Sequence, residues 1–167
     1  MAQGRYPEKA VGERSEHGSS TGGKENANNR ETSMNIEYVE NCPAIEEYFP
    51  LFLTTGWNDE YRFTEDEIRA AISGSWYVVS AYDGGRLIGF GRTISDGIHH
   101  ALIVDMIVHP EYQGRGIGGE ILKRIVAECR SRNIRDVQLF AAKGKAGFYQ
   151  KHGFAARLAD APGMELK

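Results

Sequence analysis

The chain has 167 residues, 41% of them hydrophobic, and a formal net charge of −3 at pH 7. This length and composition suit one globular domain with an ordinary core. The slight acidity, together with the lack of a basic stripe with interleaved aromatic residues, argues against nucleic-acid binding. The sequence has no apolar run of membrane-spanning length, so we expect neither nucleic acid nor membrane as a partner.

Residues 1–33 differ in composition from the rest of the chain. They are rich in Gly, Ser, Asn and charged residues, and Tyr6 is their only aromatic residue. Such a segment cannot bury enough apolar surface to offset its ordering entropy. It also lacks the apolar core of a signal peptide, and its glutamates count against a transit peptide. We predict a flexible extension over 1–33, followed by one domain over 34–167.

The first part of the domain predicts one strand and two helices. Alternating apolar residues indicate a strand over 35–40. Pro43 can open a helix, which Pro50 should interrupt. Thr64-x-x-Glu67 has the pattern of a capping box, so a second helix is predicted over 65–72.

Turn signals then separate further elements. Asp83-Gly84-Gly85 and Ser95-Asp96-Gly97 divide three strands of an antiparallel meander. Apolar residues at helical spacing indicate a long helix after the third of these strands, and Asn133 suits a left-handed stop. The predicted strands are 76–82, 86–94, 100–108, 136–141, 154–157 and 164–167, and the predicted helices are 117–132 and 145–150. The order predicts an α/β (α+β) domain with a mixed, mostly antiparallel sheet and about four helices.

Four glycines dominate the stretch after the predicted fourth strand, Gln113-Gly114-Arg115-Gly116-Ile117-Gly118-Gly119. Glycine removes side chains that would keep a ligand off the backbone, and a helix start presents unpaired N–H groups at its positive dipole end. Such a turn binds anions, and pyrophosphate is the best candidate. The alternative is a tight turn without a ligand, for which one glycine would suffice.

The same letters also satisfy the G-x-G-x-x-G fingerprint, as Gly114, Gly116 and Gly119. In a dinucleotide-binding fold an acidic residue ends the second strand, whereas Asp136 stands at the beginning of the next predicted strand here. The sequence therefore disfavours a dinucleotide-binding fold.

The glycine stretch and a second motif together resemble a known superfamily. Gln113-Gly114-Arg115-Gly116-Ile117-Gly118, after Met106-Ile107-Val108, resembles the Q/R-x-x-G-x-G/A acetyl-CoA motif of GNAT N-acetyltransferases. Phe148-Tyr149-Gln150-Lys151-His152-Gly153-Phe154 resembles their F-Y-x-x-x-G-F motif. The resemblance covers about 35–167, and looks closest to the small bacterial, archaeal and plant-plastid group that includes plant-type arylalkylamine (serotonin) N-acetyltransferases.

This resemblance implies a GNAT fold, in which the fourth and fifth strands splay apart around the cofactor's pantetheine arm. It implies an acetyl-CoA-dependent N-acetyltransferase that acts by direct attack of a primary amine of a small molecule or peptide. The alternative is a GNAT-like sensor that binds acyl-CoA without turnover. The implied cofactor-binding residues are Met106, Ile107 and Val108, through their main chains, with Gln113, Gly114, Arg115, Gly116, Ile117, Gly118, Gly119 and Tyr149.

Two side chains are candidates for proton transfer. Tyr149 could act as general acid toward the departing thiolate, or could be a buried aromatic residue with a satisfied hydroxyl. Asp105 interrupts the apolar face between Ile103 and Ile107, where an unpaired carboxylate would be costly. It could bind the acceptor ammonium and accept its proton, or serve as a structural carboxylate.

The remaining signals are weaker. Ala142 stands seven residues before Tyr149, where many GNAT sequences have Asn or Asp, which weakens the arylalkylamine assignment. Acceptor specificity in such folds is expected from 42–72 and 155–164, and three aromatic residues hint at an acceptor pocket: Trp57, Tyr61 and Phe63.

The Cys and His residues predict no metal site and no catalytic cysteine. Cys42 and Cys129 have no metal-like or redox-like spacing, and His99 and His100 lack partners at ligand spacing. His99 and His100 are also expected in a hairpin turn, away from the cofactor. We expect a reducing, cytoplasmic location and a monomer or homodimer.

Overall fold

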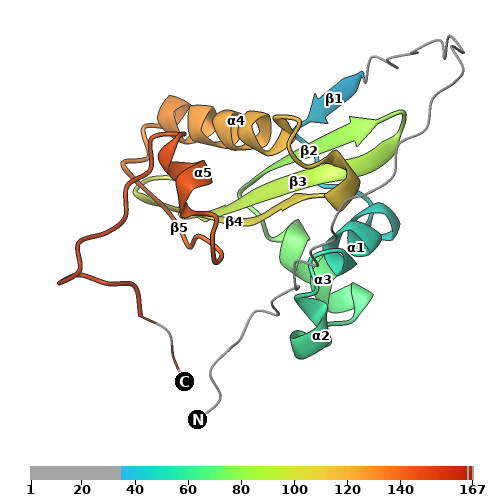
Figure 1. Ribbon diagram of the computed structural model, residues 1–167, viewed down its shortest axis with the longest axis horizontal. Helices are drawn as coiled ribbons and strands as arrows, with labels where there is room; N and C mark the ends of the chain where they lie inside the picture. The colour runs from blue at the N-terminus through green and yellow to red at the C-terminus, as the bar shows by residue number, and fades with distance from the viewer. Residues whose placement is uncertain (1–34, 165, 167) are drawn as a thin grey trace, which may run out of the picture. The chain divides into compact units, whose positions relative to one another are not determined.

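The computed structural model describes residues 35–164 and 166, which form a five-stranded sheet with helices against both faces (Figure 1). The strands are β1 (Ile36–Val39), β2 (Tyr77–Asp83), β3 (Arg86–Ser95), β4 (His100–Val108) and β5 (Asp136–Leu139). They lie in the sheet in chain order; β1 to β4 pair antiparallel, and β5 pairs parallel to β4. The predicted mixed, mostly antiparallel sheet is confirmed. The extension predicted over 1–33 lies outside the described residues.

The helices are α1 (Ile45–Leu53), α2 (Asn58–Tyr61), α3 (Glu65–Ser73), α4 (Ile117–Ser131) and α5 (Ala146–Gln150), with a 3₁₀ turn η1 (Pro110–Tyr112). The capping box is confirmed, because the Thr64 N–H donates to the Glu67 carboxylate at 2.8 Å and the Glu67 N–H donates to the Thr64 hydroxyl at 3.3 Å. None of the helices in this described part is long and apolar enough to cross a membrane.

The predicted interruption of the first helix at Pro50 was wrong, because α1 continues through this residue to Leu53. A proline inside a helix costs about 3 kcal/mol, mainly through a lost hydrogen bond and a steric clash. Four side chains on one face of α1 are buried, each stabilising the fold by about 1.5–3 kcal/mol. Packing therefore outweighs the local penalty.

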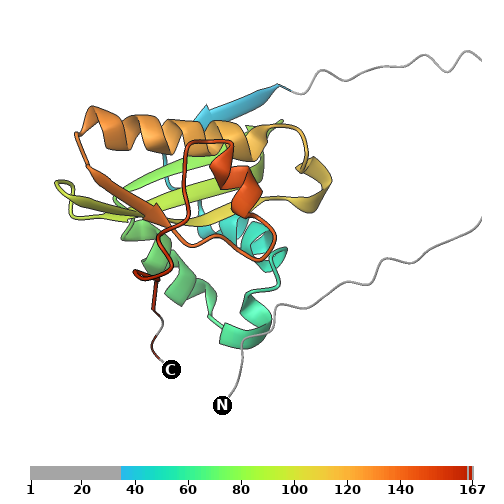
Figure 2. The same ribbon diagram turned by 60° about the vertical axis from the view of Figure 1, so that its left-hand side comes forward.

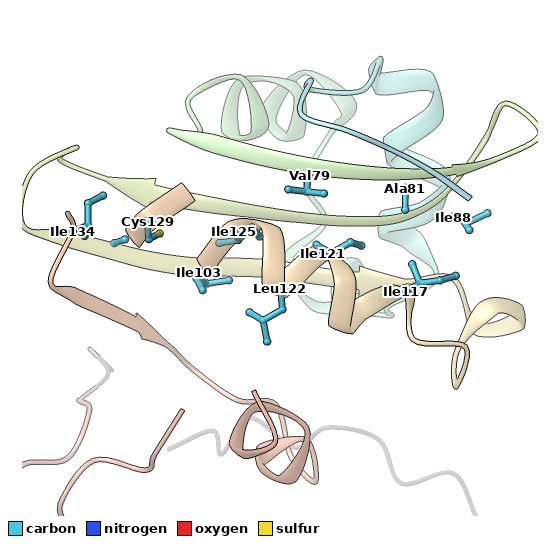
Figure 3. Packing of buried hydrophobic residues seen from close by; sticks show 11 residues of the cluster. Val79, Ala81, Ile88, Ile103, Ile117, Ile121, Leu122, Ile125, Cys129 and Ile134 are labelled. Carbon is cyan, nitrogen blue, oxygen red and sulfur yellow. The ribbon is translucent and has the colours of Figure 1, made fainter. Parts of the chain in front are cut away.

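The core lies on both faces of the sheet. Figure 3 shows α4 laying Ile121, Leu122, Ile125 and Cys129 against sheet residues that include Val79 and Ile103. The opposite face packs against α1 and α3, through a second cluster that comprises Ile45, Tyr48, Leu51, Phe52, Ile68, Ile72, Val78, Leu87, Phe90 and Ile107. Residues 42–72 thus cover the face of the sheet opposite to α4.

A β-bulge interrupts the pairing of β3 with β4. Phe90 pairs with Ile107 and Arg92 with Val104, so two residues of β4, Asp105 and Met106, lie opposite the single residue Gly91. Space explains this glycine, because a β-carbon placed there would lie 2.7 Å from both the Met106 sulfur and a methyl carbon of Ile121. The bulge lets β4 carry a side chain out of the regular alternation.

The bulge corrects the predicted alternation of β4. Ile103 and Met106 pack on the α4 side, whereas Ile107 belongs to the cluster under α1 and α3. The sequence had placed Ile103 and Ile107 on one face, with Asp105 between them. The extra residue shifts the phase of the strand, so Asp105 shares a face with Ile107 but not with Ile103.

The parallel pairing of β4 with β5 covers only part of β4. It joins residues 100–103 to residues 136–139, so the second half of β4 is unpaired on this side and the two strands diverge (Figure 2). The side chains of His100 and Asp136 contact each other at the paired end of β4 and β5, with 3.1 Å between the imidazole Nδ1 and a carboxylate oxygen. The expected opening between the fourth and fifth strands is therefore present.

The predicted strand over 154–157 was wrong, because these residues are in no strand, and neither is Met164; residues 165 and 167 lie outside the described part. Arg157 does reach β5, where its Nη1 donates to the Gln138 side-chain oxygen at 3.4 Å. Two alanines within 154–157 offer little apolar area, and Pro162 lacks an N–H for a ladder.

Candidate active site

The glycine loop follows β4 and η1 and leads directly into α4. Gly114 and Gly116 have φ angles of 78° and 82°, which favour glycine, and a β-carbon at either would meet no atom within 4 Å. No side chain caps the start of α4, where Gly116 is the N-cap residue. The amides of the first turn of α4 are therefore available to an anion.

Gly118 and Gly119 lie in the first turn of α4, beside the side chains of Val108, Phe148 and His152. A β-carbon at Gly118 would lie 3.4 Å from a methyl carbon of Val108 and 3.7 Å from the Phe148 ring. At Gly119 it would lie 3.0 Å from the His152 Nε2. Gly114 and Gly116 therefore shape an open loop, Gly118 has room for a β-carbon, and at Gly119 a β-carbon would require the His152 side chain to move.

The second half of β4 joins the loop to the opening between the strands. The Gln113 side-chain amide donates to the Val108 carbonyl at 3.0 Å, so the first residue of the loop motif is tied to the end of the strand. Met106 and Val108 pack against the α4-side core, while Ile107 is buried on the other face. These side chains belong to the core, as the sequence predicted, so only their main chains could bind a ligand.

Tyr149 lies on α5, half-buried against the α4-side core. Its ring makes edge contacts with Phe148 and Phe154, at centroid distances of 5.0 and 6.2 Å. Burial raises the pKa of the Tyr149 hydroxyl above its usual value. The phenol is thus kept protonated, which suits a proton donor.

Asp105 occupies the bulge of β4 with a φ of 51°, a left-handed conformation that is unusual for a residue other than glycine. Its Oδ2 accepts a hydrogen bond from the Arg92 Nε at 2.5 Å and one from the Tyr48 hydroxyl at 3.5 Å. The side chains of Arg92 and Asp105 are only 13% and 23% exposed. The carboxylate is therefore a partly buried member of an ion pair.

Arg92 also ties this pair to the helix on its face of the sheet, because its Nη1 donates to the Ala71 carbonyl of α3 at 3.2 Å. The sequence analysis missed Arg92 and Tyr48. The available signal for Arg92 was a charged residue inside a predicted strand that is otherwise mostly apolar. Tyr48 carries no such signal, because an aromatic residue on an apolar helix face is ordinarily part of the core.

A cavity of about 350 Å³ opens on this face of the sheet. It brings Asp105 together with Trp57, Tyr61 and Phe63, the three aromatic residues predicted to line an acceptor pocket. Glu67 adds a second carboxylate, but hydrogen bonds from Thr64 already hold it and lower its pKa. The full lining is Tyr48, Phe52, Trp57, Tyr61, Phe63, Glu67, Ile68, Ala71, Ile72, Arg92 and Asp105.

Hydrogen bonds between the Asn58 side chain and the Phe63 backbone order the aromatic rim of this cavity, which consists of Tyr61 and Phe63. The Asn58 side chain accepts from the Phe63 N–H at 2.8 Å and donates to the Phe63 carbonyl at 3.0 Å. Arg62, between the two rim aromatics, has a φ of 53°. The rings of Tyr61 and Phe63 consequently stack, with 5.5 Å between their centroids, although the side chain of Tyr61 is largely exposed.

The sequence predicted no catalytic or metal-binding role for His99, His100, Cys42 or Cys129; of these, Cys42 lies close enough to Arg92 and Tyr48 to interact electrostatically with both. The rings of His99 and His100 lie in tilted contact, with 3.9 Å between their centroids, near the start of β4 at its paired end. Cys129 is buried, which raises its thiol pKa, and Cys42 is exposed. No group of three or more His, Cys, Asp or Glu residues suited to a metal ion occurs within the described residues.

Comparison with known proteins identifies the family. Residues 74–156 match the family model described as an Acetyltransferase (GNAT) domain. The chain is similar to rice "Serotonin N-acetyltransferase 2, chloroplastic", 35% identical over 98 residues that cover 56% of this chain and 49% of the relative. It is also similar to Arabidopsis thaliana "GCN5-related N-acetyltransferase 2, chloroplastic", 41% identical over 71 residues that cover 42% and 28%. The chain thus spans about half the length of such relatives, or less.

Solved structures extend the similarity to most of the domain. A probable acetyltransferase from meticillin-resistant Staphylococcus aureus has a TM-score of 0.70 and 29% identity, covering 79% of this chain and 98% of that one. A GNAT family protein from Streptococcus pneumoniae has a TM-score of 0.68 and 28% identity, covering 79% and 97%. The chain therefore belongs to the GNAT acetyltransferase superfamily.

Proposed function

We propose that the protein is an acetyl-CoA-dependent N-acetyltransferase that acts on a primary amine of a small molecule or peptide. One observation carries this proposal: the cavity and the backbone segment proposed to bind acetyl-CoA meet on a single strand, β4. Asp105 lines the cavity, and the next three residues of β4 run along the opening toward β5. An amine beside Asp105 would thus lie next to the strand along which a thioester would be held.

The residues present fit acetyl-CoA as a substrate. The amides at the start of α4, with the open backbone at Gly114 and Gly116, suit the pyrophosphate. Residues 106–108 lie beyond the part of β4 that pairs with β5, so no strand occupies the edge of their main chain that faces β5. Backbone groups on this edge could pair with the pantetheine amides. The thioester supplies the acyl group.

Two side chains supply the proton transfers in this proposal. Asp105 binds the acceptor as an ammonium ion and takes one of its protons, directly or through a water. The free amine then attacks the thioester carbonyl, the attacking nitrogen loses its second proton to solvent, and the C–S bond breaks as the amide bond forms. Tyr149 donates its proton to the departing thiolate, and solvent restores the phenol. Oδ2 of Asp105 is engaged with Arg92, so we assign the ammonium to Oδ1.

The cavity indicates an acceptor with an apolar or aromatic body and one positive charge. Aromatic walls contribute apolar contact and cation–π attraction, and Asp105 lies among them. The name of the rice relative supports an arylalkylamine, whereas the soybean relative named "Histone acetyltransferase TAP1", 32% identical over 101 residues, supports a peptide amine. Ala142 has no polar side chain to offer an acceptor, so the residues that line the cavity must discriminate between an arylalkylamine and a peptide amine.

Titration calorimetry with acetyl-CoA, combined with thiol release across an amine panel, tests the proposal. The panel should contain tryptamine, serotonin, an alkyl amine of matched length and a lysine peptide. We expect acetyl-CoA binding, and faster thiol release with the aromatic amines than with the alkyl control. Binding without thiol release for any amine would favour the acyl-CoA sensor, and no binding would contradict both readings.

Location and assembly are also proposed. The rice and Arabidopsis relatives are named chloroplastic. For this chain we propose a reducing, cytoplasmic location, from its free cysteines Cys42 and Cys129, and a monomer or homodimer. Fractionation of the source cells and light scattering of the purified protein would test these two points.

A further inference from the structure

The turn between β2 and β3 contacts the segment that leads from β4 into the glycine loop. The Asp83 carboxylate accepts a hydrogen bond from the Tyr112 hydroxyl at 3.1 Å. On the other side of the turn, Arg86 Nη2 lies 3.0 Å from the His109 Nε2, and Arg86 Nη1 lies 3.6 Å from a Glu111 carboxylate oxygen. Two residues of one turn thus reach three of the four residues before Gln113.

The Tyr112 ring connects this turn with the glycine loop itself. The Arg86 guanidinium carbon lies 5.9 Å from the ring centroid, and that of Arg115 lies 5.4 Å from it. One guanidinium comes from the β2–β3 turn and the other from the loop. Both distances are within the range of cation–π attraction.

The start of the segment is fixed through the main chain. The His109 N–H donates to the Ile88 carbonyl of β3 at 2.8 Å, and Gln113 is bonded to the Val108 carbonyl. The loop beyond Gln113 contains glycines, which gain the most conformational freedom when unrestrained. Contacts that order its leading segment before a ligand arrives reduce the ordering cost of binding.

These contacts are suited to positioning rather than to stabilising the fold. The side chains of Arg86 and Glu111 are 55% and 70% exposed, and exposed ion pairs contribute little to stability. We infer that Asp83 and Arg86 are positioning residues for acetyl-CoA: through Tyr112 and the η1 turn they hold the glycine loop in its binding conformation. This inference rests on the proposed function and deepens it.

Calorimetric affinity for acetyl-CoA, measured together with steady-state kinetics, tests the inference with three variants. Arg86→Ala, Asp83→Asn and Tyr112→Phe should each raise the Kd of acetyl-CoA about 5- to 20-fold, the scale of a lost preorganising contact. Once acetyl-CoA is saturating, kcat and the KM for the amine should stay within about twofold of wild type, because no reacting group has changed. Arg86→Lys keeps one donor and should restore part of the affinity.

Arg132→Ala is the matched control. Arg132 is also an exposed arginine in an ion pair, with Glu128, but it follows the far end of α4. Its removal should leave the Kd of acetyl-CoA unchanged.

Tyr112→Phe separates positioning from direct attraction between Arg86 and the phosphates, because it changes no charge. If Arg86→Ala weakens binding while Tyr112→Phe and Asp83→Asn do not, direct attraction explains the result and the inference is overturned. Equal affinity in all three variants and wild type would also overturn it. A wild-type protein that fails to bind acetyl-CoA would contradict the proposed function instead, so the two failures are distinguishable.

Discussion

At the scale of single residues, the pairing of Asp105 with Arg92 changes how its role can be tested. The ion pair is partly buried, so removing the carboxylate leaves a guanidinium without its partner. Breaking such a pair costs up to about 3–5 kcal/mol when the pair is fully buried, and less here. A lower melting temperature is therefore expected for an Asp105 variant whether or not Asp105 is a base, and stability alone cannot separate the two roles.

Asp105→Asn is therefore best examined through its pH profile. If Asp105 accepts the proton of the ammonium, the variant should lose about 10²–10⁴-fold in kcat/KM near neutral pH. This loss should shrink as pH rises, because the amine then deprotonates unaided. Thiol release measured from pH 6.5 to 9.5 checks this, with Tyr48→Phe as a control that removes only the 3.5 Å contact. A loss of equal size at every pH would leave Asp105 a structural role only.

Tyr149→Phe removes a proton donor while keeping the ring in its contacts with Phe148 and Phe154. We expect acetyl-CoA affinity to hold and kcat to fall about 10²-fold or more, the usual scale for general acid catalysis. Because burial raises the pKa of Tyr149, the wild-type rate should show no alkaline decline from this group below the ordinary tyrosine pKa of about 10. Full kcat in the variant would show that water protonates the thiolate or that chemistry is not rate-limiting.

At the scale of elements, α4 begins on glycines that serve different purposes. Gly116 faces open space in a left-handed conformation, whereas a β-carbon at Gly119 would lie 3.0 Å from the side chain of His152, which follows α5. Gly116→Val should therefore abolish most acetyl-CoA affinity, while Gly119→Val should displace the exposed His152 side chain and lower the melting temperature only modestly. Calorimetry and thermal melting of both variants check this contrast. A folded Gly116→Val protein of unchanged affinity would remove the basis for the loop assignment.

The sequence predicted elements best where a local signal decides the structure. The capping box placed the start of α3, and turn glycines placed the meander, because both act over four residues. The sequence did not reveal features that depend on distant partners. The bulge at Asp105 depends on how α4 packs over Gly91, and α1 survives Pro50 because its apolar face is buried. The strand predicted over 154–157 needed a partner, and no described residue supplies one.

In the candidate site too, contiguous residues could be predicted from the sequence, and contacts between distant residues could not. Sequence motifs located the glycine loop and Tyr149, since their residues are contiguous. They also indicated the aromatic pocket, from three residues within one segment. The ion pair of Arg92 with Asp105 and the contacts of the β2–β3 turn with Tyr112 join residues that are distant in the chain, and only the folded sheet brings them together. Pairings of this kind leave no periodic signal.

At the scale of the whole molecule, the two faces of the sheet carry the two proposed binding sites, one for the acceptor amine and one for acetyl-CoA. One face carries the cavity proposed for the acceptor, under residues 42–72, and the other carries α4 and the glycine loop. The strand β4 is common to both, and its bulge brings a carboxylate to one face while its second half stays open on the side toward β5. A reaction between ligands on the two sides can therefore take place at one strand.

Deletion of residues 1–33 tests whether the domain over 34–167 is sufficient. These residues carry little apolar side-chain surface, so they can contribute little to a core. All the site residues proposed above follow Asn41 in the chain. We expect the truncated protein to keep its acetyl-CoA affinity within about twofold and its melting temperature within about 4 °C, a change of less than about 1 kcal/mol for a domain of this size. Calorimetry and thermal melting at two protein concentrations check this, because a concentration-dependent difference would indicate a contact between chains. A larger drop at both concentrations would show that the segment packs on its own domain, and that the domain boundary lies earlier in the sequence.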